Sequence, residues 1–471
     1  MIDKSVGVRH RIDCNLTVAL VCALAFGLAT ARPAAGTNFV VTRGPYLQSG
    51  SASEMTVRWR TDAPTDALVR FGTTLGNLNL SQAGDSVTTE HVVRITGLDP
   101  DTKYFYSVGN GAATISGGDA THFFRTSPAT GTPKPTRIWV LGDSGTSGAN
   151  AAAVRDAWLG FTAEHGQELW LMLGNNAFNS GTDLEFQSGV FDFYPTVLRN
   201  TPLWPTFGNR DGVSADSATQ TGPYYDIFTL PKNGQSGGLA SGTEAFYSFD
   251  YGNVHFICLD SHETSRSPAG AMMTWLAADL AAADGFDWIV AFWHHPPYTK
   301  GSHDSDSETQ LAEMRENALP ILEAHGVDLV LAGHSQSYER SFLLDGHYGL
   351  SFELQPANVL DSGNGDPDGD GAYVKPSAGP APHEGTVYAV AGSGGALGGG
   401  TLDHPAMVVS LNQLGSMALD FEGRVLFARF VNGAGVITDQ FRIVKGDSGL
   451  FVDGFNFGDA CAWTAAVGGS C

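Results

Sequence analysis

The 471-residue chain is predicted to fold as a layered α/β sandwich that follows an all-β module. Two observations predict this arrangement. Between residues 38 and 127, apolar and polar residues alternate with a period of two, as they do in half-buried strands. From residue 136 to 446, short apolar runs alternate with segments of helical character, which indicates strands and helices packed in layers. A linker rich in Pro, Gly and Thr, residues 128–135, separates the two parts.

The all-β module is predicted from two segments. Residues 55–60 alternate around Trp59, and residues 97–106 form a turn that enters a strand with aromatic residues at every second position. The Trp59 strand and the run Leu-x-Pro-x-Thr-x-Tyr-x-Tyr at residues 98–106 resemble a fibronectin type III-like sandwich. We expect a structural role for this module, because nothing in it has the pattern of a catalytic site.

The α/β part is predicted to contain buried strands separated by helices. Strands are expected at residues 137–141, 169–173, 287–293 and 328–332, and helices at residues 151–165, 271–283 and 308–325. A hairpin is expected over residues 244–250 and 254–259. Four further strands, at residues 386–391, 417–421, 424–431 and 437–444, are expected to complete a second sheet.

The N-terminus has the pattern of a secretory signal peptide over residues 1–31. A basic start is followed by the apolar run 16–31, and Ala29-Thr30-Ala31 fits a small-x-small cleavage site. A transmembrane anchor is the alternative, but the apolar run is short for a span of ~20 residues. We therefore expect a secreted protein, extracellular or periplasmic. Residues 447–471 form a Gly-rich tail to which no function is assigned.

The five cysteines give limited information about the fold. Cys14 and Cys22 lie in the predicted signal peptide, and Cys258 lies in an apolar run where a buried free thiol is expected. Cys461 and Cys471 could close a small loop in an oxidising compartment. The chain has no Cys-x-x-Cys pair, so a zinc site built on thiolates is not supported.

The formal net charge of −23 excludes some classes of partner. An acidic surface repels the phosphate backbone of nucleic acids and anionic lipids, so neither nucleic acid nor a membrane surface is an expected partner. Any phosphate site would need its own local positive charge. The oligomeric state is left open.

Five short polar segments carry the functional signal. They are Gly-Asp-Ser-Gly at 142–145, Gly-Asn-Asn-Ala-Phe at 174–178, Gly-Asn-Arg-Asp at 208–211, His-His-Pro-Pro-Tyr at 294–298 and Gly-His-Ser-Gln-Ser-Tyr-Glu-Arg at 333–340. Four of them directly follow predicted strands. Because ligands bind at the carboxyl ends of strands in open α/β sheets, these segments are expected to meet at one rim.

The order and spacing of these segments resemble the purple acid phosphatase family of calcineurin-like metallophosphoesterases, over about residues 38–445. The resemblance implies a two-sheet metallophosphoesterase sandwich flanked by helices, preceded by the fibronectin type III-like domain. It also implies hydrolysis of phosphomonoesters at two metal ions. Such ions lower the pKa of bound water from 15.7 to about 7 and hold the attacking and leaving oxygens.

The resemblance assigns metal-ligand positions, and several hold an altered residue. The first ion would be held by Asp143, by Asn175 at the position of the bridging Asp, by Phe178 at the position of a Tyr, and by Gln336 at the position of a His. The second ion would be held by Asn209, His294, His334 and the bridge. Phe178 has no donor atom, and amide oxygens are weak ligands for transition metals. The substitutions are therefore concentrated on the first ion.

Three further residues are candidates for a catalytic role. Arg210 stands where the family has a His; arginine stays charged near neutral pH, and it can bind phosphate in a fork but cannot donate a proton. His303 lies where the family places a substrate-contacting His, and His295, beside His294, is expected to support the ligands. The alternatives remain that Asp143 and Asn209 stabilise turns and that His294 and His334 are hydrogen-bonded core histidines.

Three hypotheses for function follow. In the first, the dinuclear centre has degenerated, and phosphomonoesterase activity is weak or absent. In the second, one ion on Asn209, His294 and His334 serves a mononuclear hydrolase, with Arg210 holding the phosphate. In the third, the chain binds a phosphate ester or phosphate anion without cleaving it. The cofactor implied by the resemblance is Fe, Zn or Mn, with one ion at most expected here.

Overall fold

The computed structural model describes residues 39–162, 166–283 and 285–446. The predicted signal peptide, the Gly-rich tail and the cysteines other than Cys258 lie outside the described residues. Cys258 is buried and free, which confirms the expectation for this thiol. In the part of the chain that is described, we find no helix with the length and apolar character needed to cross a membrane.

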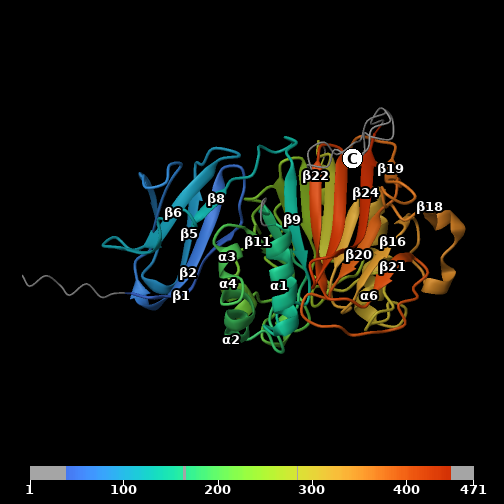
Figure 1. Ribbon diagram of the computed structural model, residues 1–471, viewed down its shortest axis with the longest axis horizontal. Coiled ribbons are helices and arrows are strands. Elements are labelled where there is room, and N and C mark those ends of the chain that lie inside the picture. Colours follow the sequence, from blue (N-terminus) through green and yellow to red (C-terminus); the bar gives the residue numbers. More distant parts are fainter. Residues whose placement is uncertain (1–38, 163–165, 284, 447–471) are drawn as a thin grey trace, which may run out of the picture. The chain divides into compact units, whose positions relative to one another are not determined.

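The first module is all-β, as predicted (Figure 1). One sheet has the order β1-β2-β5, with bounds Val41–Gln48, Glu54–Thr65 and Thr88–Thr96. The other has the order β4-β3-β6-β7, with β8 paired to β6, and bounds Leu80–Ala83, Leu68–Gly72, Lys103–Gly109, Thr114–Gly117 and Phe123–Arg125. The core of this module contains Trp59 of β2 and Tyr104 and Tyr106 of β6, since alternate residues of a strand face the same side.

Two seven-stranded sheets form the α/β domain. The first sheet has the order β11 (Leu203–Pro205), β10 (Leu169–Met172), β9 (Thr136–Leu141), β22 (Gly415–Glu422), β23 (Val425–Asn432), β24 (Ile437–Lys445) and β19 (Tyr373–Lys375). The second sheet has the order β12 (Tyr247–Tyr251), β13 (Val254–Cys258), β14 (Trp288–Trp293), β15 (Leu329–Ala332), β20 (Val387–Ala391), β16 (Tyr338–Ser341) and β21 (Met407–Leu411). A small sheet pairs β17 (Leu343–Leu344) with β18 (Val359–Asp361).

Short helices connect and cover these strands. The α-helices are α1 (Ala149–Phe161), α2 (Asp183–Phe186), α3 (Pro195–Leu198), α4 (Pro223–Ile227), α5 (Ala271–Ala282), α6 (Thr309–Asn317) and α7 (Leu319–Ala324). One π-helical turn, η1, spans Gln187–Phe191, and three 3₁₀ turns are η2 (Asp211–Val213), η3 (Ser351–Glu353) and η4 (Pro356–Asn358). The predicted single helix at 308–325 is two helices, because Pro320 lacks the N–H that would continue α6 into α7.

The central strands are apolar on both faces because each face packs on a different layer. In β14, Val290 and Phe292 belong to the core that contains residues of both sheets. Ile289, Ala291 and Trp293 belong to a second core, which contains residues of α5 to α7. This burial on both sides explains why the strand is an uninterrupted apolar run rather than an alternating one.

The assignment of the C-terminal strands to one sheet was wrong in part. β20 pairs with β15 and joins the second sheet, whereas β22 pairs with β9 and, with β23 and β24, extends the first sheet. The hydrophobic pattern of a strand shows that it is buried but not which strand it pairs with. The fold class itself, a two-sheet α/β sandwich with an all-β module before it, is confirmed.

Candidate metal centre

Five loops bring the candidate ligands together, three from the first sheet and two from the second, and Asn209 lies in the loop after β11. Asp143 and Asn175 follow β9 and β10 of the first sheet, and His294 and His334 follow β14 and β15 of the second. Three of these residues have a positive φ: 54° at Asp143, 53° at Asn175 and 64° at His334. Residues other than glycine seldom adopt this left-handed backbone conformation. Such backbone conformations are concentrated at functional sites, where the surrounding structure holds them.

Close approach of the loops requires glycine at one position in particular. Gly174 has a φ of +86°, and a Cβ there would lie 2.5 Å from Nδ1 of His294. Any other residue would therefore displace the His294 ring as well as strain the backbone. The glycine before Asn175 thus lets the loop after β10 reach the histidine after β14.

His294 presents a lone pair to the centre of the cluster. Its Nδ1 lies 2.7 Å from the carbonyl oxygen of Leu173, so the N–H on this nitrogen donates to that carbonyl. Burial lowers the pKa of His294 well below its ordinary value, which keeps the ring neutral. A neutral ring with its proton on Nδ1 has its lone pair on Nε2.

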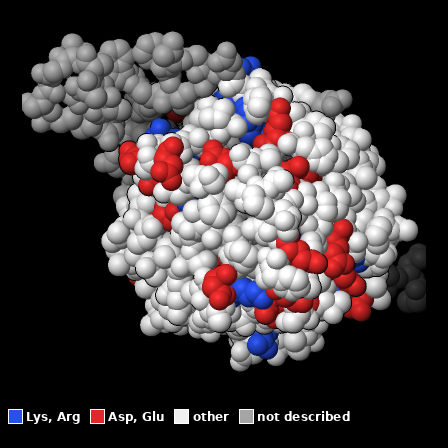
Figure 2. All heavy atoms as spheres, turned by 90° about the vertical axis from the view of Figure 1, so that its right-hand side faces the viewer, with Lys and Arg blue, Asp and Glu red and all other residues white. Residues whose placement is uncertain are grey.

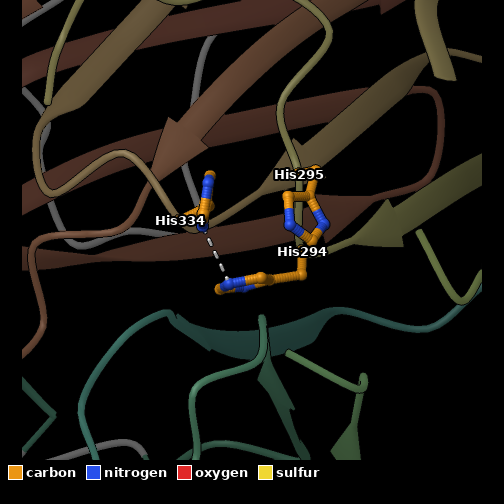
Figure 3. A group of neighbouring side chains, drawn as sticks. All are labelled: His294, His295 and His334. Atoms are coloured by element: carbon orange, nitrogen blue, oxygen red, sulfur yellow. Dashed lines mark hydrogen bonds between the residues drawn. The ribbon is translucent and has the colours of Figure 1, made fainter. Parts of the chain in front are cut away.

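Two other donor atoms lie close to that lone pair. Nε2 of His294 is 3.0 Å from Oδ1 of Asn209. It is also 3.2 Å from Nδ1 of His334 (Figure 3). An amide oxygen has no hydrogen to share with the lone pair of His294. Imidazole nitrogen and oxygen donors are ligands that Zn²⁺ and similar ions accept. The residues present therefore fit one divalent ion on Asn209, His294 and His334.

The position of the family's bridging carboxylate is occupied by an amide with both ends hydrogen-bonded. Nδ2 of Asn175 donates to Oδ1 of Asp143 at 2.8 Å, and Oδ1 of Asn175 accepts from the backbone N–H of Arg210 at 2.8 Å. The other carboxylate oxygen of Asp143 accepts from the backbone N–H of His334 at 2.6 Å. Burial raises the pKa of Asp143 to about 8, although the hydrogen bonds from Asn175 and His334 oppose that rise.

The remaining positions of the first ion hold Phe178, which has no donor atom, and Gln336, which offers a neutral amide oxygen. Phe178 is half-buried, and its ring centre lies 5.8 Å from the guanidinium carbon of Arg210. The hydrogen bonds of Gln336 run through its backbone: its N–H donates to Oγ of Ser302, and its carbonyl accepts from Gly398. The residues present do not fit a first ion, since Asp143 is the one conventional ligand among them.

Arg210 lies exposed beside this cluster. Among the described residues, no carboxylate forms an ion pair with its guanidinium. Its backbone is fixed by the bond to Asn175 and by the 3₁₀ turn η2 that begins at Asp211. A charged fork without a protein partner is available to an anionic ligand.

His303 and His295 lie on two sides of His334. The His303 ring stacks on the His334 ring with centroids 3.7 Å apart, and its Nδ1 pairs with Glu308 at 2.9 Å. The His295 ring centroid is 4.3 Å from that of His334, and its Nδ1 shares a hydrogen bond of 2.9 Å with Oγ of Ser261. The catalytic roles given to these residues from the sequence stay predictions.

Sequence reasoning missed two carboxylates that organise the site. Asp211 is fully buried and accepts backbone N–H groups of Gly208, Asn176 and Ala177, so it joins two of the ligand loops. Glu308 pairs with His303, but the sequence indicated only the start of a helix there. Neither residue carries a motif signal beyond closeness in sequence to a candidate residue.

Comparison with known families agrees with this architecture. Residues 43–126 match the purple acid phosphatase N-terminal domain, and residues 136–338 match the calcineurin-like phosphoesterases. Among curated relatives, purple acid phosphatase 15 of Arabidopsis thaliana is 27% identical over 338 residues, which cover 63% of this chain and 59% of the relative. An uncharacterized protein of Mycobacterium tuberculosis is 25% identical over 353 residues, which cover 65% of this chain and 63% of the relative. The chain thus spans less than two thirds of either relative.

Solved structures share the fold at low sequence identity. A purple acid phosphatase, PPD1, from yellow lupin (Lupinus luteus) seeds superposes with a TM-score of 0.68 at 16% identity, covering 86% of this chain and 75% of that one. PhoD superposes with a TM-score of 0.61 at 14% identity, covering 87% and 91%. At such identities the likeness establishes the fold alone.

Proposed function

The chain belongs to the calcineurin-like phosphoesterase family, with the N-terminal domain of purple acid phosphatases, and from this premise we propose a metallophosphoesterase with a degenerate metal centre. It holds one divalent ion at most, and its phosphomonoesterase activity is weak or lost. On the sequence of residues 1–31, we further propose that it is secreted. The N-terminal residue of the mature protein, read by mass spectrometry, tests that part; a mature chain that starts at Met1 would contradict it.

One observation carries the proposal. The Asn175 amide donates to Asp143 at the position where the family has a carboxylate between two ions. An amide nitrogen cannot bind a cation, and turning the amide over would place Nδ2 against the N–H of Arg210. Asn175 therefore cannot bridge two ions, because it has no carboxylate and because it directs its N–H toward Asp143. Phe178 and Gln336 do not replace the bridge.

The retained residues divide the remaining tasks. Asn209, His294 and His334 would hold the ion, and an ion bound there would act as a Lewis acid on a phosphate oxygen. Arg210 would bind two phosphate oxygens in a fork. His303 would contact the substrate. His295 would hold the rings of His294 and His334 in place by packing against them. Zn²⁺ or Mn²⁺ suits the nitrogen and oxygen donors; iron is the third candidate from the family.

Electrostatics restrict the substrate to small esters. On the face shown in Figure 2, acidic side chains lie in separate groups on a mostly uncharged surface, with small basic groups among them. With a net charge of −23, the chain repels polyanions at long range, and Arg210 supplies the positive charge at the site itself. We propose a phosphate ester or free phosphate as ligand, and neither nucleic acid nor a membrane surface.

Metal content and turnover test this proposal together. We expect purified protein to contain at most one transition-metal ion per chain by inductively coupled plasma mass spectrometry. Hydrolysis of para-nitrophenyl phosphate across pH should be slow or absent. If the second hypothesis, a mononuclear hydrolase, holds, activity rises with added Zn²⁺ or Mn²⁺ and disappears in His334→Ala. Two ions per chain with fast turnover would refute the degenerate centre.

The fork of Arg210 is exposed and has no carboxylate partner among the described residues, which favours a second candidate function. Such a site can retain phosphate without cleaving it. Calorimetry with inorganic phosphate in the presence of a chelator tests this function without metal catalysis. Heat that disappears in Arg210→Ala supports an anion-binding module, and no heat in the unaltered protein removes it.

A further inference from the structure

His334 has different partners on its two ring nitrogens. Nδ1 faces inward to His294 at 3.2 Å, within the inner triad Asn209, His294 and His334. Nε2 faces outward, toward Oε2 of Glu308 at 3.6 Å. His334 is only 6% exposed, and its Nε2 is buried without a hydrogen-bond partner among the described residues. A buried ring nitrogen of this kind needs a partner, which neither the inner triad nor Arg210 provides.

Two further donors lie around the outer nitrogen. The donor atoms of His303, Glu308 and His334 all lie within 4.8 Å of one another. The rings of His303 and His334 stack, and a nitrogen of each faces the same carboxylate, at 2.9 Å and 3.6 Å. Two imidazoles and one carboxylate are the protein ligands of several catalytic zinc sites.

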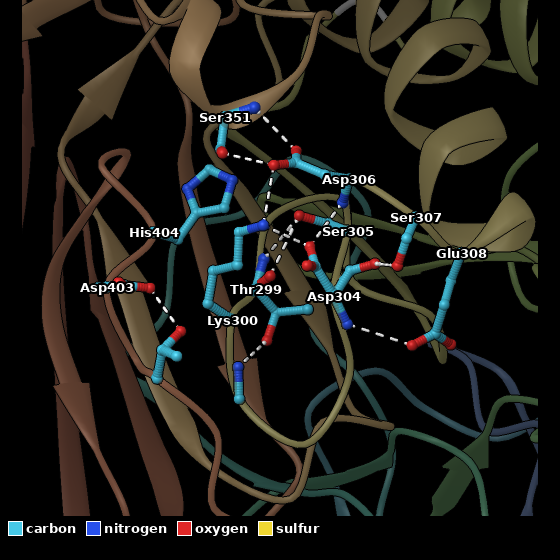
Figure 4. A network of polar contacts seen from close by, with 12 residues as sticks. Thr299, Lys300, Asp304, Ser305, Asp306, Ser307, Glu308, Ser351, Asp403 and His404 are labelled. Atoms are coloured by element: carbon cyan, nitrogen blue, oxygen red, sulfur yellow. Dashed lines mark hydrogen bonds and ion pairs between the residues drawn. The ribbon is translucent and has the colours of Figure 1, made fainter.

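The carboxylate of Glu308 is held in place by a hydrogen bond within its own loop. Oε1 of Glu308 accepts from the backbone N–H of Asp304 at 3.1 Å (Figure 4). In the same loop, Lys300 pairs with Asp306 at 2.8 Å and also with Asp304, and Asp306 accepts from the backbone N–H of Ser351 at 2.8 Å. These bonds fix the loop that carries His303 and Glu308. Ligands oriented by such outer bonds bind metal more tightly than free ones.

The outer and inner donor sets differ in charge. The inner triad consists of an amide and two neutral imidazoles, so its three ligands carry no charge. The outer set carries the negative charge of Glu308, and its exposed edge is open to water, since the side chains of His303 and Glu308 are 34% and 35% exposed. A divalent cation loses less hydration at the outer set and is better neutralised there.

We propose that His303, Glu308 and His334 form an outer divalent-cation site, for Zn²⁺ or a similar ion. Because a neutral His334 has one lone pair, the outer site and the inner triad bind an ion one at a time. When Nδ1 carries the proton, it donates to His294 and Nε2 is free for the outer ion. When Nε2 carries the proton, it faces Glu308 and Nδ1 is free for the inner ion. The statement that the two ions exclude each other rests on the proposed function, because it requires the inner ion. The outer site itself does not depend on the proposed function.

Zinc binding to five forms of the full chain separates the two sites: the unaltered chain and four variants. The probes are Zn²⁺ in calorimetry and Co²⁺ absorption, which reports the ligand set. Asn209→Ala with His294→Gln removes two inner ligands and leaves the outer site. Glu308→Gln, alone and in that background, removes the outer carboxylate while keeping the shape of the side chain. His303→Ala is a second outer variant at a half-exposed position, and thermal unfolding checks that each protein is folded.

The expected result is one Zn²⁺ in the unaltered chain and still one in the double inner variant. Adding Glu308→Gln or His303→Ala to that variant should weaken Zn²⁺ binding about 100-fold. If the double inner variant is folded and binds no Zn²⁺, the outer site is wrong and the inner ion stands. If Glu308→Gln alone abolishes binding, the outer site stands and the inner ion is wrong. Two Zn²⁺ in the unaltered chain would overturn the exclusion.

Discussion

The side-chain nitrogen of Asn175 donates a hydrogen bond of 2.8 Å to Oδ1 of Asp143, both of them buried. In a dinuclear phosphoesterase these two positions would be carboxylates that share a cation. Here one of the two is an amide, and its N–H donates to the carboxylate of the other. This hydrogen bond links the loop after β9 to the loop after β10.

Restoring the bridge should make stability depend on metal. Asn175→Asp replaces the hydrogen bond by contact between two carboxyl groups, so the metal-free protein should lose about 1–3 kcal/mol of its unfolding free energy. Added Zn²⁺ or Mn²⁺ should recover that loss, because a cation placed between the two carboxylates attracts both of them. Thermal unfolding with and without a chelator measures both effects.

Asn176→Asp is the matched control for that variant. Asn176 donates to Asp211 at 2.9 Å, a bond of the same type that does not face the inner triad. Its loss should destabilise the protein equally with and without metal. If Asn175→Asp behaves in the same way as Asn176→Asp, the Asn175 position no longer faces an ion.

Removal of one inner ligand should lower metal retention. In a Glu308→Gln background, which removes the carboxylate of the outer site, His294→Ala deletes the nitrogen that lies 3.0 Å from Asn209 and 3.2 Å from His334, so inner Zn²⁺ affinity should fall by about 100-fold or more. Competition with a chromophoric chelator measures it. His383→Ala, at a histidine whose side chain is 56% exposed, should leave affinity unchanged. Equal affinities for the two variants would place the ion elsewhere.

Removal of the exposed fork should weaken phosphate binding. Arg210→Ala deletes charge-assisted hydrogen bonds, each of which contributes about 1.5–3 kcal/mol, so the phosphate affinity should fall at least about 10-fold. Arg210→Lys keeps the charge but not the fork, and should recover only part of the affinity. Arg94→Ala, at an exposed arginine in the β-module, serves as the control in the same titration. An Arg210→Ala protein that binds phosphate normally would remove the anion site.

Stability should fall at alkaline pH because of a buried histidine in β13. Burial lowers the pKa of His255, but hydrogen bonds to Asp250 and Asp279 outweigh it and raise the pKa from 6.5 to about 9. A raised pKa means that the charged form stabilises the fold fully below pH 6.5. That contribution, about 3 kcal/mol, should be lost as the pH rises toward 9.

Urea unfolding at several pH values between 6 and 10 checks this expectation. His255→Gln should be less stable at pH 6 and should lack most of the decline above pH 7. His325→Gln is a suitable control, since the His325 side chain bonds to the backbone carbonyl of Ile321 and, among the described residues, to no carboxylate. A decline of the same size in His255→Gln would assign the pH dependence to other groups.

A buried charge cluster should make Asp328 one of the most sensitive positions in the chain. Asp328 binds Lys375 at 2.6 Å and Lys445 at 2.9 Å, and all three side chains are 0% exposed. Asp328→Asn would leave two buried ammonium groups without a carboxylate and should cost about 3–5 kcal/mol. Asp156→Asn, in an ion pair with 63% exposure of the carboxylate, should cost less than about 1 kcal/mol. Unfolding midpoints in urea compare the two, and similar costs would contradict the burial argument.

The sequence predicted the buried strands well, because their pattern depends on local apolar runs. The run at 287–293 predicted β14 to within one residue, whereas the alternation at 55–60 covers only the first part of the longer strand β2. Pairing was less accessible: nothing local to residues 417–444 indicates that β22 lies against β9 rather than in the sheet of β20. Strand pairing is a long-range choice, made by the fit of whole layers.

The candidate site shows the same division. Asp143, Asn209, His294 and His334 were named from spacing, since strand ends that carry polar residues meet at one rim. The direction of the Asn175 amide and the outward nitrogen of His334 could not be named from spacing, because each depends on a partner distant in the chain. Glu308 was missed for this reason: its closeness to His334 exists only after the loop at 299–308 has folded against the segment that follows β15.

By itself, the sequence determined the two-sheet α/β fold, the all-β module before it and the identity of the residues at each ligand position. Side-chain chemistry is fixed by residue type, so the loss of the Tyr, His and bridging Asp positions could be read directly. Only the tertiary structure decided how the remaining donors face one another. Hydrogen bonds such as those from Asn175 to Asp143 and from His294 to the Leu173 carbonyl set ring and amide orientation, and orientation determines which lone pairs a cation can reach.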